Sequence, residues 1–172
     1  MMSDDRAENL FLEADELISD NKIREAKEIL LELLADYPDY GRAHNHLGWM
    51  YNMKFNNYNK AKQHYELALK FAPDYHAVYT NYSYLLIDMN MFDEMIAFGA
   101  KVVNNRIADQ ATIFNKVGQA YELKGNAVEA FKFYKKAVTS TINNKYLEDL
   151  YASIHRVRGK MTLLQKLRII NK

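Results

Sequence analysis

Histidines and cysteines are the residues that most often hold metal ions or act as nucleophiles, and in this chain they are scarce and scattered. Cysteine is absent, which excludes thiolate zinc sites and a cysteine nucleophile. His44 and His46 are two residues apart, so on a helix their side chains point to nearly opposite faces and cannot share one metal ion. His64, His76 and His155 are isolated in the sequence. We expect these histidines to be structural or solvated, and we expect no metal site.

Other catalytic signals are equally weak. Lys124-Gly125-Asn126 contains a lone glycine and does not match a glycine-rich phosphate loop. The acidic pairs Glu8/Asp15 and Asp93/Glu94 have no neighbours of the kind that acid–base catalysis requires. The sequence therefore predicts neither an enzyme nor a bound cofactor.

The elements that would position any functional side chain follow first from composition. Hydrophobic residues make up 49% of the 172 residues and charged residues 26%, a balance that supports a buried core and excludes a disordered chain. The chain has only six glycines and two prolines, too few for the frequent turns of a β-sandwich or barrel. We expect an all-α fold.

Charge is distributed unevenly, although the net charge is only +1. Residues 1–40 carry 12 acids and four bases, the remainder carries 10 acids and 19 bases, and residues 155–172 carry six bases and no acid. No stretch reaches the ~18 apolar residues that a membrane span requires, and the chain starts with acidic residues, unlike a signal peptide. We expect a cytoplasmic protein with no membrane partner.

Internal repetition organises the chain with a period of 34 or 35 residues. Pro38 and Pro73 stand 35 residues apart in the same Pro-Asp-Tyr triplet. A small residue recurs with the same period at Ala14, Gly48, Ser83, Gly118 and Ala152, and a second series runs through Ala26, Ala61, Met95 and Ala130. Small residues let two helix axes approach closely, and each period has room for two helices separated by a polar break. Gly125 suits the end of one helix, and Asn126 with Glu129 suits the cap of the next.

This pattern resembles the tetratricopeptide repeat family. Leu47-Gly48-Trp49-Met50-Tyr51, followed by Ala61, Tyr65, Ala68 and Pro73, matches the family pattern at its expected offsets, as does the equivalent stretch from Val117 to Ala137. The resemblance implies a single array, a right-handed superhelical solenoid of antiparallel helix pairs. We place its repeats at 7–40, 41–75, 76–110 and 111–144, with a degenerate fifth unit or capping helix pair at 145–172.

The third repeat departs from the pattern. Met95 and Gly99 occupy positions where alanine and a bulky residue are typical, and Ile107 stands where the closing proline would be. We expect looser helical packing there.

The first helix of each repeat has one face that packs on its neighbour and, by the 3.6-residue period, an opposite face that is free for binding. The resemblance implies that this second face lines a concave groove. It carries Glu8, Phe11, Leu12, Asp15 and Ile18 in the first repeat. Our candidate peptide-binding residues in the later repeats are Arg42, Asn45, His46, Trp49, Asn52, Thr80, Asn81, Tyr84, Asn115, Lys116 and Gln119.

Amides and aromatic rings on this face suit a peptide. Asparagine offers a donor and an acceptor to an extended backbone, and Trp49 and Tyr84 offer flat apolar anchors. Two interpretations of Trp49 remain open, namely contact with a ligand and packing against the adjacent repeat. The family's clamp for a terminal carboxylate is matched at Asn81 and Lys116 but not at Asn45, Trp49 or Thr112, so we expect no such clamp.

The leading functional hypothesis is a non-catalytic module that binds a peptide or helix of another protein, as a scaffold or a chaperone-like adaptor. One alternative is self-assembly through the acidic N-terminal end and the basic C-terminal helices, where an apolar stripe is formed by Met161, Leu163, Leu164, Leu167 and Ile170. A nucleic-acid binder is a weaker alternative, because the bases lie apart from the aromatic residues of the groove.

Overall fold

The computed structural model describes residues 2–170, and every helix or strand assigned in that range is an α-helix. The all-α fold class predicted from the sequence is therefore confirmed. Two compact units make up the chain, Met1–Leu85 and Leu86–Lys172. Lys172, one of the six bases of the C-terminal tail, lies outside the described residues.

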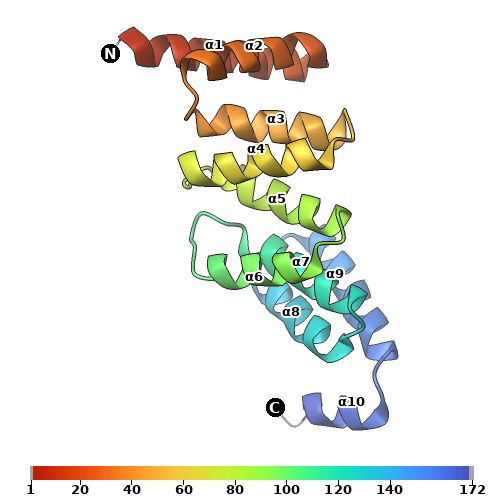
Figure 1. Ribbon diagram of the computed structural model, residues 1–172. Helices are drawn as coiled ribbons and strands as arrows, with labels where there is room; N and C mark the ends of the chain where they lie inside the picture. The colour runs from red at the N-terminus through yellow and green to blue at the C-terminus, as the bar shows by residue number, and fades with distance from the viewer. Residues whose placement is uncertain (1, 171–172) are drawn as a thin grey trace. The chain divides into compact units, whose positions relative to one another are not determined.

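The first unit consists of antiparallel helix pairs (Figure 1). Its helices are α1 (Met2–Ser19), α2 (Ile23–Asp36), α3 (Gly41–Met53), α4 (Tyr58–Phe71) and α5 (His76–Asp88), the last of which crosses the boundary between the units. α1 packs on α2 and α3 packs on α4. Each of the repeats predicted at 7–40 and 41–75 thus contains one helix pair, and Pro38 and Pro73 lie in the turns between pairs, where no helical N–H is needed.

Glycine allows the two helices of the second pair to approach closely. A Cβ atom on Gly48 of α3 would lie only 2.6 Å from the ring of Tyr65 on α4, so no larger residue fits there without a shift. The small residues Ala14, Ala26 and Ala61 are fully buried. Small residues were expected to recur once per period because they let two helices approach closely, and this contact confirms that reason.

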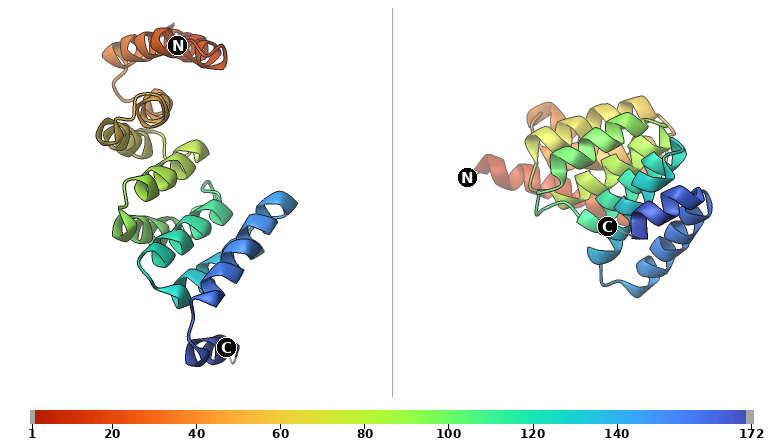
Figure 2. Two further views of the ribbon diagram at one scale, coloured as in Figure 1. Left: turned by 90° about the vertical axis from the view of Figure 1, so that its right-hand side faces the viewer. Right: turned by 90° about the horizontal axis from the view of Figure 1, so that it is seen from below.

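The second unit contains α6 (Phe92–Val102), α7 (Gln110–Leu123), α8 (Ala127–Thr139), α9 (Asn144–Gly159) and α10 (Leu163–Ile170). α7, α8 and α9 pack side by side (Figure 2). A Cβ on Gly118 would lie 2.8 Å from the ring of Tyr134, the same close approach as between Gly48 and Tyr65. The two units therefore use one packing device at equivalent positions.

The turns α1–α2, α3–α4, α5–α6 and α7–α8 each contain one residue in the left-handed region of the backbone. These residues are Asn21 (φ 59°), Asn56 (φ 51°), Asn90 (φ 57°) and Gly125 (φ 78°). Glycine has no steric penalty in this conformation, and asparagine tolerates it better than most other residues. The side chain of Asn126 accepts a hydrogen bond from the backbone N–H of Glu129, as the predicted cap requires.

Where the third repeat meets the fourth, α6 packs closely on α7. Met95 is fully buried, and a Cβ on Gly99 would lie 2.3 Å from Cγ2 of Val117 on α7. The missing bulk at Gly99 thus brings α6 close to α7. The third repeat has no closing proline, and the connection that follows it differs from the others. α6 is short, and residues 103–109 are not helical.

The last two helices close the second unit. Leu150 and Val157 of α9 and Met161 join the buried core formed with Ala130 and Tyr134 of α8. α10 begins at Leu163, beyond the C-terminal end of α9 (Figure 2). Two helices, α9 and α10, thus lie where the sequence predicted a degenerate fifth unit or a capping helix pair.

Candidate functional site

In the first unit, the predicted binding residues of α1 and α3 meet around one phenylalanine. Phe11 of α1 is buried beneath the side chains of α3. The Arg42 guanidinium lies 4.6 Å from the centre of the Phe11 ring, and the His46 ring meets it edge-on at 4.8 Å. Such cation–π and edge-to-face contacts are favourable geometries for these rings. They hold Arg42 and His46 in fixed orientations on this surface.

A carboxylate on α1 fixes the position of Arg42. The guanidinium forms an ion pair with Glu8 and donates a hydrogen bond to the phenol oxygen of Tyr40, whose O–H donates to Glu8 at 2.7 Å. The hydrogen bond from Tyr40 and the charge of Arg42 lower the pKa of Glu8, against the opposing effect of partial burial. Burial and the neighbouring carboxylate raise the pKa of Tyr40 to about 12, so its proton stays in place.

His46 forms a second link between α1 and α3. Its Nε2 lies 3.0 Å from Oδ1 of Asp15, which fixes the ring orientation. The other ring nitrogen, Nδ1, is buried and has no hydrogen-bond partner. Asp15 itself is mostly exposed and places a carboxylate at the surface near Arg42 and Tyr75. Burial, together with the charge of Asp15, raises the pKa of Tyr75.

The amides expected to contact a peptide are partly used inside the first unit. Asn45 is 3% exposed, and its side-chain oxygen accepts a hydrogen bond from Nδ2 of Asn81 at 3.1 Å. Asn52 is also buried. The Asn45–Asn81 bond joins α3 to α5, so these two asparagines position the helices of this surface.

The aromatic residues of the same face are accessible. Tyr84 of α5 is 43% exposed, and Trp49 of α3 is half-buried with the Lys54 ammonium 5.4 Å from its ring centre. Thr80 is half-buried one turn before Tyr84. We name the surface formed by Phe11, Asp15, Arg42, His46, Trp49, Thr80, Asn81 and Tyr84 the α1–α3–α5 face.

The candidate residues of the second unit all lie on α7. Asn115 donates from Nδ2 to the hydroxyl of Tyr146 at 2.9 Å, which links α7 to α9. Lys116 is 8% exposed and its Nζ lies 3.3 Å from Oε1 of the half-buried Gln119. Burial lowers the pKa of Lys116 to about 8, although the charge of Asp88 opposes the shift. This lysine is therefore a partly desolvated cation inside the second unit.

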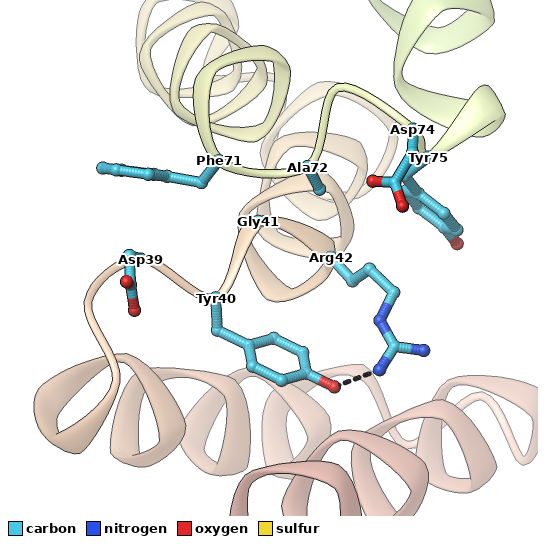
Figure 3. A pocket seen from close by; sticks show the side chains of 8 residues that line it. All are labelled: Asp39, Tyr40, Gly41, Arg42, Phe71, Ala72, Asp74 and Tyr75. Atoms are coloured by element: carbon cyan, nitrogen blue, oxygen red, sulfur yellow. Dashed lines mark hydrogen bonds between the residues drawn. The ribbon is translucent and has the colours of Figure 1, made fainter. Parts of the chain in front are cut away.

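A pocket of about 450 Å³ adjoins the α1–α3–α5 face (Figure 3). It is lined by Asp39, Tyr40, Gly41, Arg42, Phe71, Ala72, Asp74 and Tyr75. In Figure 3 the Tyr40 hydroxyl and the Arg42 guanidinium point toward each other. Because Glu8 already pairs with Arg42, the carboxylates of Asp39 and Asp74 leave the pocket with a negative character.

Sequence reasoning did not assign Tyr40 and Tyr75 to a site, although their signal was present. Both belong to the repeated Pro-Asp-Tyr triplet, which the sequence showed only as a turn between helix pairs. The fold brings the two triplets to one pocket because each lies just before a first helix, α3 or α5.

His64 is isolated in the sequence but contacts another histidine in the fold. Nδ1 of His64 on α4 lies 3.0 Å from Nδ1 of His44 on α3, and Nε2 of His44 lies 3.0 Å from the carbonyl oxygen of Pro38. Burial lowers the pKa of His64 to about 4 and also lowers the pKa of His44. The 20-residue separation hid this contact, which depends on the packing of α3 against α4. Within the described range, no group of three or more acidic or histidine side chains is placed to hold a metal ion.

A comparison with protein families matches residues 11–76 to a tetratricopeptide repeat model. That segment contains Phe11, Asp15, Arg42, His46 and Trp49 and all eight residues that line the pocket. No curated protein matches the chain significantly by sequence. None of the helices in the described residues is long and apolar enough to cross a membrane.

Solved structures share the fold. PilF of Pseudomonas aeruginosa is 15% identical with a TM-score of 0.73, over 93% of this chain and 77% of PilF. PilW, described as a type IV pilus biogenesis factor, is 14% identical with a TM-score of 0.69, over 92% of this chain and 80% of PilW. MamA is 21% identical with a TM-score of 0.69, over 81% of this chain and 75% of MamA. At these identities the likeness shows the fold alone.

Proposed function

We propose that this chain is a non-catalytic module that binds a peptide or a helix of a partner protein on the α1–α3–α5 face, because residues 11–76 match a tetratricopeptide repeat model and the fold is similar to that of PilF. Proteins with this fold generally bind other proteins, and the partner here is defined by the chemistry of the face. The proposal rests on the exposure of Tyr84, on a face that also contains the half-buried Trp49. The polar residues of this face already form hydrogen bonds with one another. Preorganised polar groups around accessible aromatic rings are typical of binding hot spots.

The charge of the face suggests the composition of the ligand. Arg42 is paired with Glu8, so its charge is largely compensated. Asp15, Asp39 and Asp74 leave carboxylates around the face and the adjoining pocket. A ligand segment with apolar side chains for the two aromatic residues and a basic side chain for the pocket would complement this arrangement.

Arg156 and Lys160, two bases of the C-terminal tail, both bind Glu122. That pairing reduces the charge available to a phosphate backbone, so the observations favour a protein ligand over a nucleic acid.

The test is a selection of peptides from a phage-displayed random library against the full chain, followed by affinity measurement on variants. Trp49 is the only tryptophan, so its fluorescence reports binding near α3 directly. Tyr84→Ala should weaken the selected peptides roughly thirtyfold, the effect of losing about 2 kcal/mol at a hot spot.

Tyr58→Ala is a matched control, because Tyr58 is 41% exposed but lies on the second helix α4. Equal losses for Tyr84→Ala and Tyr58→Ala, or no loss for Tyr84→Ala in a folded protein, would contradict use of the α1–α3–α5 face. Far-UV circular dichroism checks that each variant is folded.

A further inference from the structure

The last helix of the second unit has apolar residues on two opposite sides. α10 and the turn before it pack onto the core of α8 and α9 through Met161 and Ile169. On the other side, Leu163, Leu164 and Leu167 are 80%, 72% and 57% exposed. A helix with apolar residues on both sides is ordinarily buried between two partners. The exposed side, the leucine face of α10, therefore lacks a partner within the described chain.

The repeat architecture indicates what kind of partner fits such a face. The second helix of a pair packs against the first helix of the following pair, as α2 does on α3, α6 on α7 and α8 on α9. The element that this fold places against an apolar helix face is thus another helix.

The leucine face of α10 is bordered by positive charge. Lys166 and Arg168 lie on α10, and neither forms an ion pair within the described residues. Residues 155–172 contain no acid. A partner helix must therefore offer exposed carboxylates next to an apolar surface.

α1 of the first unit has these properties. A shallow hollow of about 370 Å³ on its surface is lined by Asp5, Arg6, Asn9, Leu10 and Glu13. Arg6 is held by ion pairs with Glu32 and Asp36 of α2, whereas Asp5 and Glu13 form no ion pair among the residues described. The two free carboxylates thus stand beside the apolar side chain of Leu10 on a first helix.

We infer that the leucine face of α10 docks on α1 of a second copy of this chain, with its leucines in the hollow and with Lys166 and Arg168 facing Asp5 and Glu13. The two surfaces differ, so the contact is heterologous and adds further copies until a ring closes or a filament grows. An anionic lipid surface would also attract the bases, but it gives no role to the acidic hollow on α1. The complementary surfaces on one chain favour a second copy.

The experiment is sedimentation velocity on the full chain over a range of concentrations, at low and high salt. The mass should rise above the 20.1 kDa of one copy as concentration increases, and high salt should weaken the association. Leu163→Ser/Leu167→Ser should weaken it at least about tenfold, because two apolar side chains lose their burial. Ile142→Ser is the matched control, since Ile142 is 98% exposed in the same unit but lies outside α10.

Charge exchange separates a specific contact from a folding defect. Asp5→Lys/Glu13→Lys and Lys166→Glu/Arg168→Glu should each abolish association when studied alone, because each variant then presents like charges at both surfaces. An equimolar mixture of the two variants should associate again, since each supplies the charge that the other now needs. Restoration in the mixture also shows that both variants are folded.

The inference is overturned if the wild-type chain stays a single copy at every concentration, or if the mixture of charge variants does not associate. It is also overturned if the wild-type chain remains monomeric but binds vesicles containing phosphatidylglycerol through the leucines of α10. The peptide affinity of the Tyr84→Ala variant is measured separately, so failure here leaves the proposed function untouched.

Discussion

The two units each contain a carboxylate–arginine pair between first helices exactly one repeat apart, but the pairs differ in burial. Glu8 and Arg42 in the first unit, and Glu122 and Arg156 in the second, are each separated by 34 residues. The Glu8 side chain is 44% exposed, whereas the Glu122 side chain is 8% exposed. Ion pairs with the same 34-residue spacing are therefore solvated in one unit and shielded in the other.

The shielded carboxylate has more partners. Glu122 accepts hydrogen bonds from Nε and a terminal nitrogen of Arg156 at 2.7 and 2.9 Å, from Lys160 at 2.8 Å and from the hydroxyl of Tyr134 at 2.8 Å. These interactions, led by Arg156, lower the pKa of Glu122 to about 2, against the opposing effect of burial. Glu122 thus joins α7, α8 and α9. The 34-residue spacing thus brings the carboxylate and the arginine together, whereas burial determines how much their ion pair contributes to stability.

The largest expected effect follows from removing the shielded charge. Glu122→Gln should reduce the free energy of unfolding by about 2 kcal/mol at neutral pH, because Arg156 and Lys160 lose a desolvated anion but remain half-exposed themselves. Urea denaturation followed by far-UV circular dichroism measures the loss, and hydrogen exchange should show faster opening of α9. Glu148→Gln on the exposed side of α9 is the control and should change the stability little.

The pH dependence of this effect has a defined sign. Since the pKa of Glu122 is lowered from 4.5 to about 2 in the folded chain, its contribution is complete above pH 4.5 and is lost as the pH falls toward 2. The difference in stability between the wild type and Glu122→Gln should therefore shrink over that window. A difference that stays constant from pH 7 to pH 3 would show that the charge of Glu122 is not the cause.

A second prediction asks whether the first unit loses stability at a different pH. Burial, together with the charges of His44 and Lys60, lowers the pKa of His64 from 6.5 to about 4. The unfolded chain then binds a proton that the folded chain does not, so stability should fall as the pH drops through 6.5 toward 4. At pH 5 a shift of this size costs at most about 2 kcal/mol, and the loss should be visible in the fluorescence of Trp49 during urea unfolding. His64→Gln should reduce this dependence, and the lowered pKa of His44 should leave the remainder.

His76→Gln is the control for that experiment, because His76 is exposed at the start of α5 in the same unit. The unit that contains His64 should weaken on mild acidification, whereas the unit that contains Glu122 should hold until the pH is well below 4.5. If both units lost stability at the same pH, the predicted difference between them would be wrong.

The sequence predicted the helix pairs because the period of 34 or 35 residues is set by packing, and packing selects small residues at fixed positions. Gly48 and Gly118 illustrate this, since each contacts a tyrosine ring that a Cβ would strike. At Gly99 the family pattern has a bulky residue, and its absence led us to expect looser packing in the third repeat. Val117 of the neighbouring helix occupies that space, and a sequence does not show which partner fills a missing volume.

The candidate site was predicted less completely, for a physical reason. The helical period indicates which face a residue occupies but not which side chains on two helices bond to each other. Asn45 and Asn81 were correctly placed on one face, yet their mutual hydrogen bond was not foreseen. The same limit applies to His44 and His64, and to Glu122. The four hydrogen bonds of Glu122 come from three residues, namely Tyr134 on α8, Arg156 on α9 and Lys160, which follows α9.

A third prediction compares equivalent turns in the two units. Gly125 has a positive φ of 78°, and a Cβ added there would meet no atom within 4 Å. Gly125→Ala should therefore cost about 1 kcal/mol through backbone strain alone, without a steric clash. Asn56→Gly at the equivalent turn of the first unit, where φ is 51°, should change the stability by less than about 0.5 kcal/mol. A neutral Gly125→Ala would mean that this turn relaxes to another conformation.

The smallest effect should come from the solvated pair. Glu8→Gln removes the ion pair with Arg42, but the guanidinium keeps its contact with the Phe11 ring and its hydrogen bond to Tyr40. Because water already screens this pair, the unfolding free energy should fall by at most about 0.5 kcal/mol. High salt should reduce even that difference, whereas it should affect the Glu122→Gln difference less. A Glu8→Gln loss equal to that of Glu122→Gln would show that sequence spacing, and not burial, determines the contribution of these pairs.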